Sequence, residues 1–432
     1  MTRISMQNIE AVDNGTDGVL FKEIGQQPFS IDLNHLPSFE YGLKTTTESP
    51  LCKILNANWD GDGDKQHQLY ICRFFALLFP GMFGANPIVI NQGEHRSGKT
   101  TAAKLIGWLL LGRDFSATIL NRDIKDVETA LSNDFLVLFD NADSGKDARS
   151  IEDLIAVAST GGSIRRRELY TTNTSVSAQL TSQVFFTSRG RTFDRNDVVD
   201  RCFFFKFAQF GQAGGRQAES ELTMTHAVID QRDTLMAEVI VKCQNILRSL
   251  DAKRDVTYLS NSRLQDFSRF CLAVADSEGW LPQMQGIFQS VSDEQKRIST
   301  EANPLHPLIR LAIGYDQRAM AKPMCAGELA LMLDDVATRA HVNSPARKDP
   351  KSLAQLISVA QSEFKANLGL IVVMDKKVKR NLYSFRPAAE TLAECIEEAG
   401  RHADPHPADG ISEHPSLLLG VSGESTQSPT IM

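Results

Sequence analysis

The chain has 432 residues, of which 42% are hydrophobic and 23% charged, so it suits a globular protein that is too long for one ordinary core. No stretch approaches the roughly 18 consecutive apolar residues that a membrane-spanning helix needs, and the first residues lack the apolar core of a secretory signal. The seven cysteines include no CxxC pair, which predicts reduced thiols in a cytoplasmic protein.

The formal net charge of −7 is unevenly distributed along the chain. Residues 388–432 carry eight acidic side chains and one arginine, so the rest of the chain sums to zero. Within that remainder, residues 303–387 carry 13 Lys or Arg against seven Asp or Glu. A surface that binds nucleic acid is therefore expected in this basic C-terminal module.

Short apolar strands alternate with helices over the first half of the chain. After an irregular arm or adaptor at 1–50, an apolar helix is predicted at 69–79, where a Pro-Gly pair ends it. The predicted strands are 87–91, 116–120, 134–140, 182–188 and 202–207, and the predicted helices are 99–111, 123–133 and 149–159. Continuous apolar strands between helices indicate an α/β core at 51–212, with a parallel sheet that helices cover on both faces.

The second half of the sequence is mostly helical in pattern. Residues 213–302 place hydrophobic residues at helical spacing and are expected to form a helical subdomain. Residues 303–387 are expected to form a winged-helix domain, with helices at 306–315, 326–340 and 351–368 and a hairpin of strands 370–374 and 381–385. The acidic segment 388–432 is expected to be disordered apart from a short helix at 390–398.

The motif GEHRSGKT at 93–100 follows an apolar strand and opens a helix. In this context GxxxxGKT binds the phosphates of a nucleotide, because N–H groups of the loop and of the helix N-terminus point at phosphate oxygens. Lys99 is expected to contact the β- and γ-phosphates, and the Thr100 hydroxyl to bind Mg²⁺. The predicted nucleotide-binding residues are Gly93, Glu94, His95, Arg96, Ser97, Gly98, Lys99, Thr100 and Thr101.

The segment DFLVLFDNAD delivers Asp140 to the end of a buried strand, where a carboxylate can hold the water shell of Mg²⁺. The next residue is Asn141, which can orient a water molecule but cannot take its proton. The catalytic base is therefore absent, indirect, or supplied by Asp143 or Glu94. The strand at 182–188 ends in Thr187-Ser188, polar residues placed to sense the γ-phosphate or the attacking water.

Four arginines follow that strand within thirteen positions: Arg189, Arg191, Arg195 and Arg201. An arginine presented to the nucleotide of a neighbouring subunit stabilises transition-state charge and couples hydrolysis to ring assembly. Arg201, directly before the strand at 202–207, is the first candidate for this role, and Arg195 is the second. A surface salt bridge is the alternative for each.

Two basic segments are candidates for DNA binding. A predicted hairpin before the fourth strand contains Arg165, Arg166 and Arg167, which can line a pore and contact the phosphates of a single strand. The tip of the C-terminal hairpin can dock duplex DNA through Lys376, Lys377, Lys379 and Arg380. Ordinary pairing with acidic neighbours is the alternative for both segments.

In these motifs and their order, the chain resembles the helicase-like P-loop ATPases of phage, plasmid and integrated mobile elements. They belong to the AAA+ and superfamily 3 helicase group and are often associated with primases. The resemblance covers about residues 50–387 and rests on GEHRSGKT, LVLFDNAD, RRRELYTTN and DRNDVVDR, where Arg201 matches the family's arginine position. It implies a ring-shaped, ATP- and Mg²⁺-dependent motor on DNA in replication of a mobile element, with a primase as a possible partner chain.

Two other functions compete with the motor. A DNA-binding switch, in which nucleotide drives assembly without unwinding, is favoured by Asn141 and by the ending Thr-Ser-Arg where the family usually has a sensor Asn. A small-molecule kinase would use the same P-loop, but it explains neither the arginine cluster nor the basic hairpin.

Overall fold

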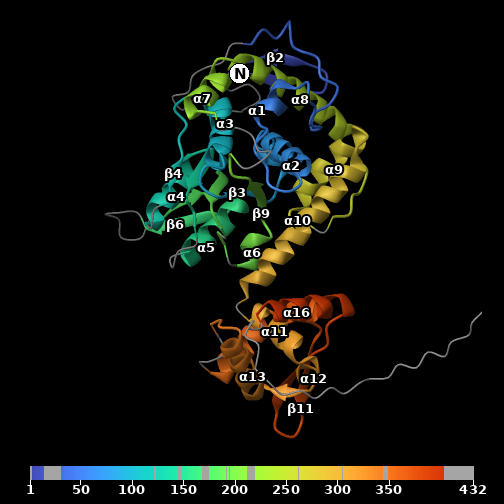
Figure 1. Cartoon of the computed structure of the whole chain (residues 1–432). Helices are drawn as coiled ribbons and strands as arrows, with labels where there is room; N and C mark the ends of the chain where they lie inside the picture. Colours follow the sequence, from blue (N-terminus) through green and yellow to red (C-terminus); the bar gives the residue numbers. More distant parts are fainter. Residues whose placement is uncertain are drawn as a thin grey trace, which may run out of the picture. The chain divides into compact units, whose positions relative to one another are not determined.

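The computed structural model of the chain contains two compact units, Met1–Ala302 and Asn303–Met432, which are shown in Figure 1. No helix in the part of the chain that the structure describes is long and apolar enough to cross a membrane. The structure describes residues 2–13, 31–120, 123–143, 148–167, 175–190, 192–193, 195–211, 219–260, 262–303, 305–343 and 349–402.

A five-stranded parallel sheet lies at the centre of the first unit, in the order β4-β5-β8-β3-β9 (Figure 1). It confirms the predicted parallel α/β core. The strand at 116–120 is shorter than expected, because only two of its residues pair with β5. The strands are β3 Ile88–Gly93, β4 Thr118–Ile119, β5 Leu136–Asp140, β8 Gln183–Ser188 and β9 Cys202–Phe207.

Ten α-helices of the first unit are described, together with a 3-10 turn at Pro80–Met82. They are α1 Pro50–Ile54, α2 Gly63–Ala76, α3 Lys99–Leu111, α4 Ile124–Asn133, α5 Ala148–Ser159, α6 Asn196–Val199, α7 Glu221–Ile229, α8 Arg232–Ala252, α9 Gln265–Ser277 and α10 Leu281–Ala302.

Helices cover both faces of the sheet, because successive side chains along each strand point to opposite faces. Val89, Leu138 and Phe185 belong to the core that includes buried residues of α2, α3, α8 and α9. Ile90 and Val137 belong to a second core, shared with α4, α5 and α6. The helices of 213–302, the expected helical subdomain, bury their apolar stripes in the first core.

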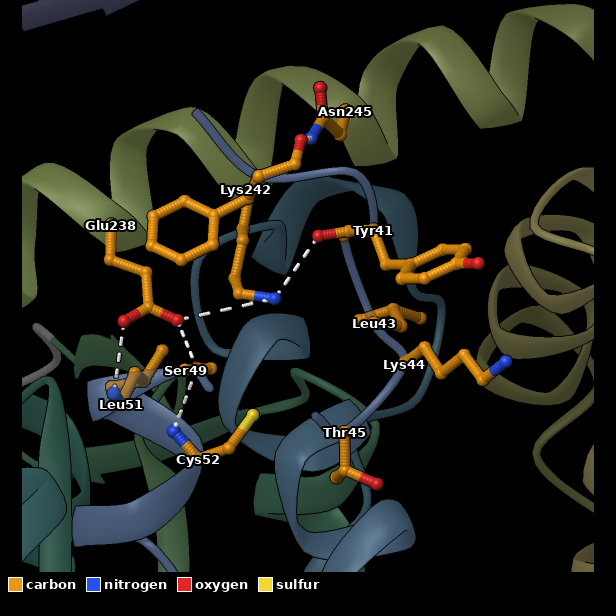
Figure 2. A network of polar contacts seen from close by, with 12 residues as sticks. Tyr41, Leu43, Lys44, Thr45, Ser49, Leu51, Cys52, Glu238, Lys242 and Asn245 are labelled. Carbon is orange, nitrogen blue, oxygen red and sulfur yellow. Dashed lines mark hydrogen bonds and ion pairs between the residues drawn. The ribbon is translucent and has the colours of Figure 1, made fainter. Parts of the chain in front are cut away.

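The segment 39–51 is held against α8 by buried polar contacts (Figure 2). The Glu238 carboxylate accepts hydrogen bonds from the Ser49 hydroxyl and, at 2.9 Å, from the Leu51 N–H at the start of α1. Lys242 Nζ lies 4.0 Å from Glu238 Oε1 and donates to the Tyr41 carbonyl at 3.0 Å. This part of the expected N-terminal arm is therefore built into the first unit.

A second carboxylate anchors the same segment. Glu278 accepts hydrogen bonds from the N–H groups of Gly42, Leu43 and Lys44, the latter two at 3.1 Å. The Trp280 indole donates at 2.8 Å to Glu278 Oε2, the oxygen that also accepts from Lys44. Contacts over more than 230 residues of sequence separation cannot be read from local patterns, which is why we expected an irregular arm.

Two small antiparallel hairpins complete the first unit. β1 Thr2–Ile4 pairs with β2 Ile9–Ala11, and β6 Ser163–Arg167 pairs with β7 Ser175–Gln179. The second of these confirms the hairpin predicted before the fourth strand of the sheet. None of the seven cysteines is paired in a disulfide, and six of them are buried.

The second unit has its own hydrophobic core and a three-stranded antiparallel sheet in the order β10-β12-β11. Its elements are α11 His306–Tyr315, α12 Gln317–Met320, β10 Met324–Cys325, α13 Ala326–Arg339, α14 Pro350–Val359, α15 Gln361–Leu368, β11 Leu370–Asp375, β12 Arg380–Phe385 and α16 Ala389–Arg401. The predicted basic hairpin is formed by β11 and β12.

One expectation for this unit was wrong, and the helix expected at 390–398 is present with wider bounds. The helix predicted at 351–368 is two helices, because Ala360 leaves helical dihedral angles (φ −103°, ψ 18°) while both halves bury residues in one core. The start of the acidic segment forms α16, longer than expected, and packs on α11, where a Cβ on Gly314 would lie 2.2 Å from the Cys395 carbonyl. Arg310 also donates to Glu398 at 2.7 Å.

We predict that Glu238→Ala lowers the free energy of unfolding by about 3–5 kcal/mol, because it leaves the buried Lys242 ammonium without its countercharge. Urea denaturation followed by circular dichroism measures this loss. Asp293→Ala is the matched control: it removes an exposed carboxylate that lies 4.0 Å from Lys296 on α10, and should cost less than about 1 kcal/mol. Equal losses in the two variants would contradict a stabilising role for the buried pair.

Candidate nucleotide-binding site

The carboxyl ends of β3, β8 and β5 bring three polar segments together at one edge of the sheet. The Thr100 hydroxyl, at the start of α3, donates a hydrogen bond to Asp140 Oδ1 at 3.0 Å. The Thr187 hydroxyl, from β8, donates to the same oxygen. The parallel register thus places the end of the LVLFD strand directly against the P-loop helix.

Lys99 lies inside this edge, with only 7% of the residue exposed. Its Nζ donates to the Glu94 carbonyl at 3.2 Å, and its own carbonyl accepts from the Asn91 amide at 3.0 Å. Burial lowers the pKa of Lys99, while the nearby carboxylates of Asp140 and Asp143 favour the charged form. The ammonium is therefore a cation enclosed by the loop and close to acidic groups.

The two glycines of the motif are required by the backbone. Gly98 has a φ of +81°, and a Cβ on Gly93 would lie 2.6 Å from the Phe207 carbonyl oxygen. The Ser97 hydroxyl is buried and has no hydrogen-bond partner among the described residues. Glu94, His95 and Arg96 are exposed at the tip of the loop. The backbone N–H groups of a loop of this kind suit an anion. Thr101, the last of the predicted nucleotide-binding residues, follows the motif on α3.

The oxygens of Thr100 and Asp140 fit a hard cation such as Mg²⁺. Among the described residues, no three His, Cys, Asp or Glu side chains are grouped as a metal site. A cation at this edge would therefore take most of its ligands from water and phosphate, as Mg²⁺ does in nucleotide sites.

Asn141 directly follows Asp140 in a left-handed conformation, with a φ of +55°. Its N–H donates to the Thr187 hydroxyl at 3.1 Å, and the Ala142 N–H donates to the Thr187 carbonyl at 2.8 Å. These contacts fix the backbone of the turn and leave the Asn141 side chain exposed at the edge of the sheet. Ser188, the second polar residue of this strand end, is buried and donates to the Gly190 carbonyl at 2.8 Å.

An apolar cavity adjoins the P-loop, and sequence reasoning missed it. Its floor and walls come from Leu55–Asn58, from Gly98 and Thr101, and from Phe210 and Met224. The Phe210 N–H donates to the Arg96 carbonyl at 3.1 Å, and the ring lies against Gly98. An aromatic ring that lines an apolar cavity next to the P-loop can pack against a flat nucleotide base.

Arg201 lies at the opposite edge of the sheet from Lys99. The Arg201 carbonyl accepts a hydrogen bond from the N–H of Ile88, the first residue of β3, whereas the P-loop begins at its last residue. Strand β3 therefore separates Arg201 from the start of the P-loop by roughly 16–20 Å, at 3.3 Å per residue. Arg201 therefore cannot serve the site of its own chain.

Arg195 is engaged within its own chain. Its guanidinium donates twice to the Asp197 carboxylate, at 2.9 and 2.8 Å, and also to Asp153. The two carboxylates raise the pKa of Arg195, and Arg195 lowers that of Asp197. By contrast, burial lowers the pKa of Arg201, and the positive charge of nearby Arg263 adds to this.

The candidate DNA-binding residues lie on two hairpins. Arg165, Arg166 and Arg167 occupy β6, paired in register with Ser177, Val176 and Ser175 of β7, and the Arg165 side chain is exposed. The side chains of Arg166 and Arg167 lie outside the described part of the structure. The turn between β11 and β12 exposes Lys376, Lys377, Lys379 and Arg380. Arg191, the fourth arginine of the cluster, is also outside the described residues.

No family model and no curated protein matches the chain. Among solved structures, it is similar to the apo C-terminal region of NrS-1, with a TM-score of 0.41 and 12% identity over 81% of this chain and 77% of that chain. It is also similar to Drosophila ORC bound to DNA, with a TM-score of 0.22 and 11% identity over 86% of this chain and 96% of that chain. Likenesses this distant assign no function.

We predict that Phe210→Ala weakens binding of ATP about tenfold and leaves binding of inorganic tripolyphosphate unchanged, because the ring would stack on the base and not on the phosphates. Isothermal titration calorimetry with both ligands measures the two affinities. Phe210→Leu, which keeps the apolar bulk without the ring, should fall between the wild type and Phe210→Ala. If Phe210→Ala weakens both ligands alike, the cavity is not the site of the base.

Proposed function

We propose that the chain is an Mg²⁺-dependent ATPase that works as an oligomeric motor, a helicase or translocase, on DNA. The observation that carries this proposal is the meeting of Lys99, Thr100 and Asp140 at one edge of a parallel sheet, beside an apolar cavity that suits a base. The order of the motifs, which resembles that of AAA+ and superfamily 3 helicase-like ATPases of mobile elements, supports the choice of a motor.

Lys99, Thr100 and Asp140 would contact different parts of Mg-ATP. The Lys99 ammonium would neutralise the β- and γ-phosphates, and the loop N–H groups would hold their oxygens. Thr100 and Asp140 would hold Mg²⁺, directly or through water, and the metal would supply charge neutralisation at the phosphates. Binding would displace Lys99 from its contact with the Glu94 carbonyl.

The attacking water has no obvious carboxylate base at position 141. Asn141 and Thr187 can orient a water molecule at the edge, and Asp143 or Glu94 can accept its proton. Asp143 is the better placed of the two, because it follows the turn fixed by Thr187, whereas Glu94 is exposed at the tip of the loop.

Hydrolysis would need a second copy of the chain. Arg201 lies at the far edge of the sheet from its own P-loop, which suits an arginine that reaches the nucleotide of a neighbour in a ring. Arg195 suits this role less well, because it is already bound to Asp153 and Asp197.

DNA would contact the two basic hairpins. Arg165, Arg166 and Arg167 would grip a single strand within the pore of the ring. In the second unit, the order α11, β10, α13, α14–α15, β11, β12 supports a winged helix, with its exposed lysines on the wing to dock duplex DNA. A primase partner and a role in replication of a mobile element are part of the proposal through the family resemblance.

A DNA-binding switch with slow hydrolysis and no unwinding is the second candidate. It is favoured by Asn141 in place of a carboxylate and by Thr187 as the residue that contacts Asp140. Both functions use the same nucleotide site, so they differ in turnover rather than in binding.

We predict a steady-state ATPase rate that single-stranded DNA stimulates several-fold or more. Phosphate release from the full chain, with and without single-stranded DNA, measures it. Lys99→Ala serves as the inactive control. A slow rate that DNA leaves unchanged would favour the switch over the motor.

Arg201→Ala is expected to retain ATP binding and to lose turnover by a factor on the order of 10³, since an arginine supplied in trans stabilises only the transition state. Binding is measured by calorimetry and turnover by phosphate release. Unchanged turnover in this variant would rule out Arg201 as the residue that acts on the neighbouring site.

A further inference from the structure

Arg189 follows β8 at the same edge of the sheet as the P-loop. Gln92 of β3 pairs in register with Ser188 of β8, so the next step along the two strands sets Gly93, the first residue of the motif, beside Arg189. β8 lies between the P-loop strand and the strand that ends in Asp140. Among the described arginines of this cluster (Arg189, Arg195 and Arg201), Arg189 is therefore the one that the register brings to the nucleotide site of its own chain.

The backbone of Arg189 is fixed on both sides. Its N–H donates to Asp143 Oδ1 at 2.7 Å. The carbonyl of the following Gly190 accepts hydrogen bonds from the Gln92 amide at 2.9 Å and from the Ser188 hydroxyl at 2.8 Å. Contacts with β3, β8 and the turn after β5 thus fix the Cα position of Arg189.

The side chain of Arg189 is held more loosely than its backbone. Its Nε lies 3.9 Å from Asp143 Oδ2, and the two side chains are 50% and 45% exposed. A pair this long and this exposed contributes at most about 1 kcal/mol. The guanidinium can therefore exchange its partner at little cost.

Both members of the pair act on Lys99. The positive charge of Arg189 lowers the pKa of Lys99, and the negative charge of Asp143 raises it. These directions agree with the register, which brings Arg189 beside the first residue of the motif that contains Lys99.

We infer that Arg189 binds the γ-phosphate within its own subunit, and that Asp143 holds the guanidinium beside the site until a nucleoside triphosphate arrives. The inference rests on the proposed nucleotide site and adds a residue that distinguishes ATP from ADP. A guanidinium binds phosphate oxygens through two parallel hydrogen bonds, which a single carboxylate oxygen at 3.9 Å does not offer.

The test compares the affinities of ADP and of a non-hydrolysable ATP analogue, measured by calorimetry with Mg²⁺ on the full chain. Arg189→Gln should weaken binding of the analogue about tenfold or more, the value of a charged hydrogen bond, and should change the affinity for ADP by less than about threefold. Asp143→Asn should increase the preference for the analogue over ADP, because it releases the arginine.

Arg339→Gln is the matched control, since it breaks an exposed Arg–Asp pair of the same kind, with Asp335, on α13 of the second unit. It should leave both affinities unchanged. Equal weakening of both ligands by Arg189→Gln, or no weakening, would overturn the inference while leaving the nucleotide site intact. An unchanged preference in Asp143→Asn would overturn the holding role of Asp143. A wild-type protein that binds neither ligand would overturn the proposed function itself.

Discussion

The candidate site depends on the parallel register of β3, β8 and β5. Because the carboxyl ends of these strands meet at one edge, Lys99, Thr187 and Asp140 come together although they are spread over almost ninety residues of sequence. A slip of one residue in β8 would turn Thr187 away from Asp140 and exchange the residues of the two cores. Successive residues of β8 are buried in two different cores, and the packing of these cores fixes the register and, with it, the site.

The site extends beyond the sheet through the N-terminal segment. Glu238 of α8 caps α1, and α1 leads directly into Leu55–Asn58, which line the cavity beside the P-loop. The wall of the cavity is thus connected to a helix that lies nearly two hundred residues later in the chain. In the first unit, the segment before the sheet, the P-loop and the helices after the sheet form one structure around the site.

The sequence predicts the elements with strong local signals and misses those made by long-range contacts. α3 and β9 have the predicted bounds, because a P-loop opens the helix and the strand is a continuous apolar run. The anchoring of residues 39–51 depends on Glu238 and Glu278, which look like ordinary surface residues in an amphipathic pattern. Phe210 is one more aromatic in a phenylalanine-rich segment, and only the structure places it beside Gly98.

If nucleotide bound at Lys99 assembles the chain into a motor, mass photometry will detect the change in particle mass. The wild type and Lys99→Ala are each measured alone and with a non-hydrolysable ATP analogue and single-stranded DNA. We expect a ring-sized oligomer that needs the analogue and that Lys99→Ala abolishes. A particle that stays near 47.8 kDa under every condition would contradict it.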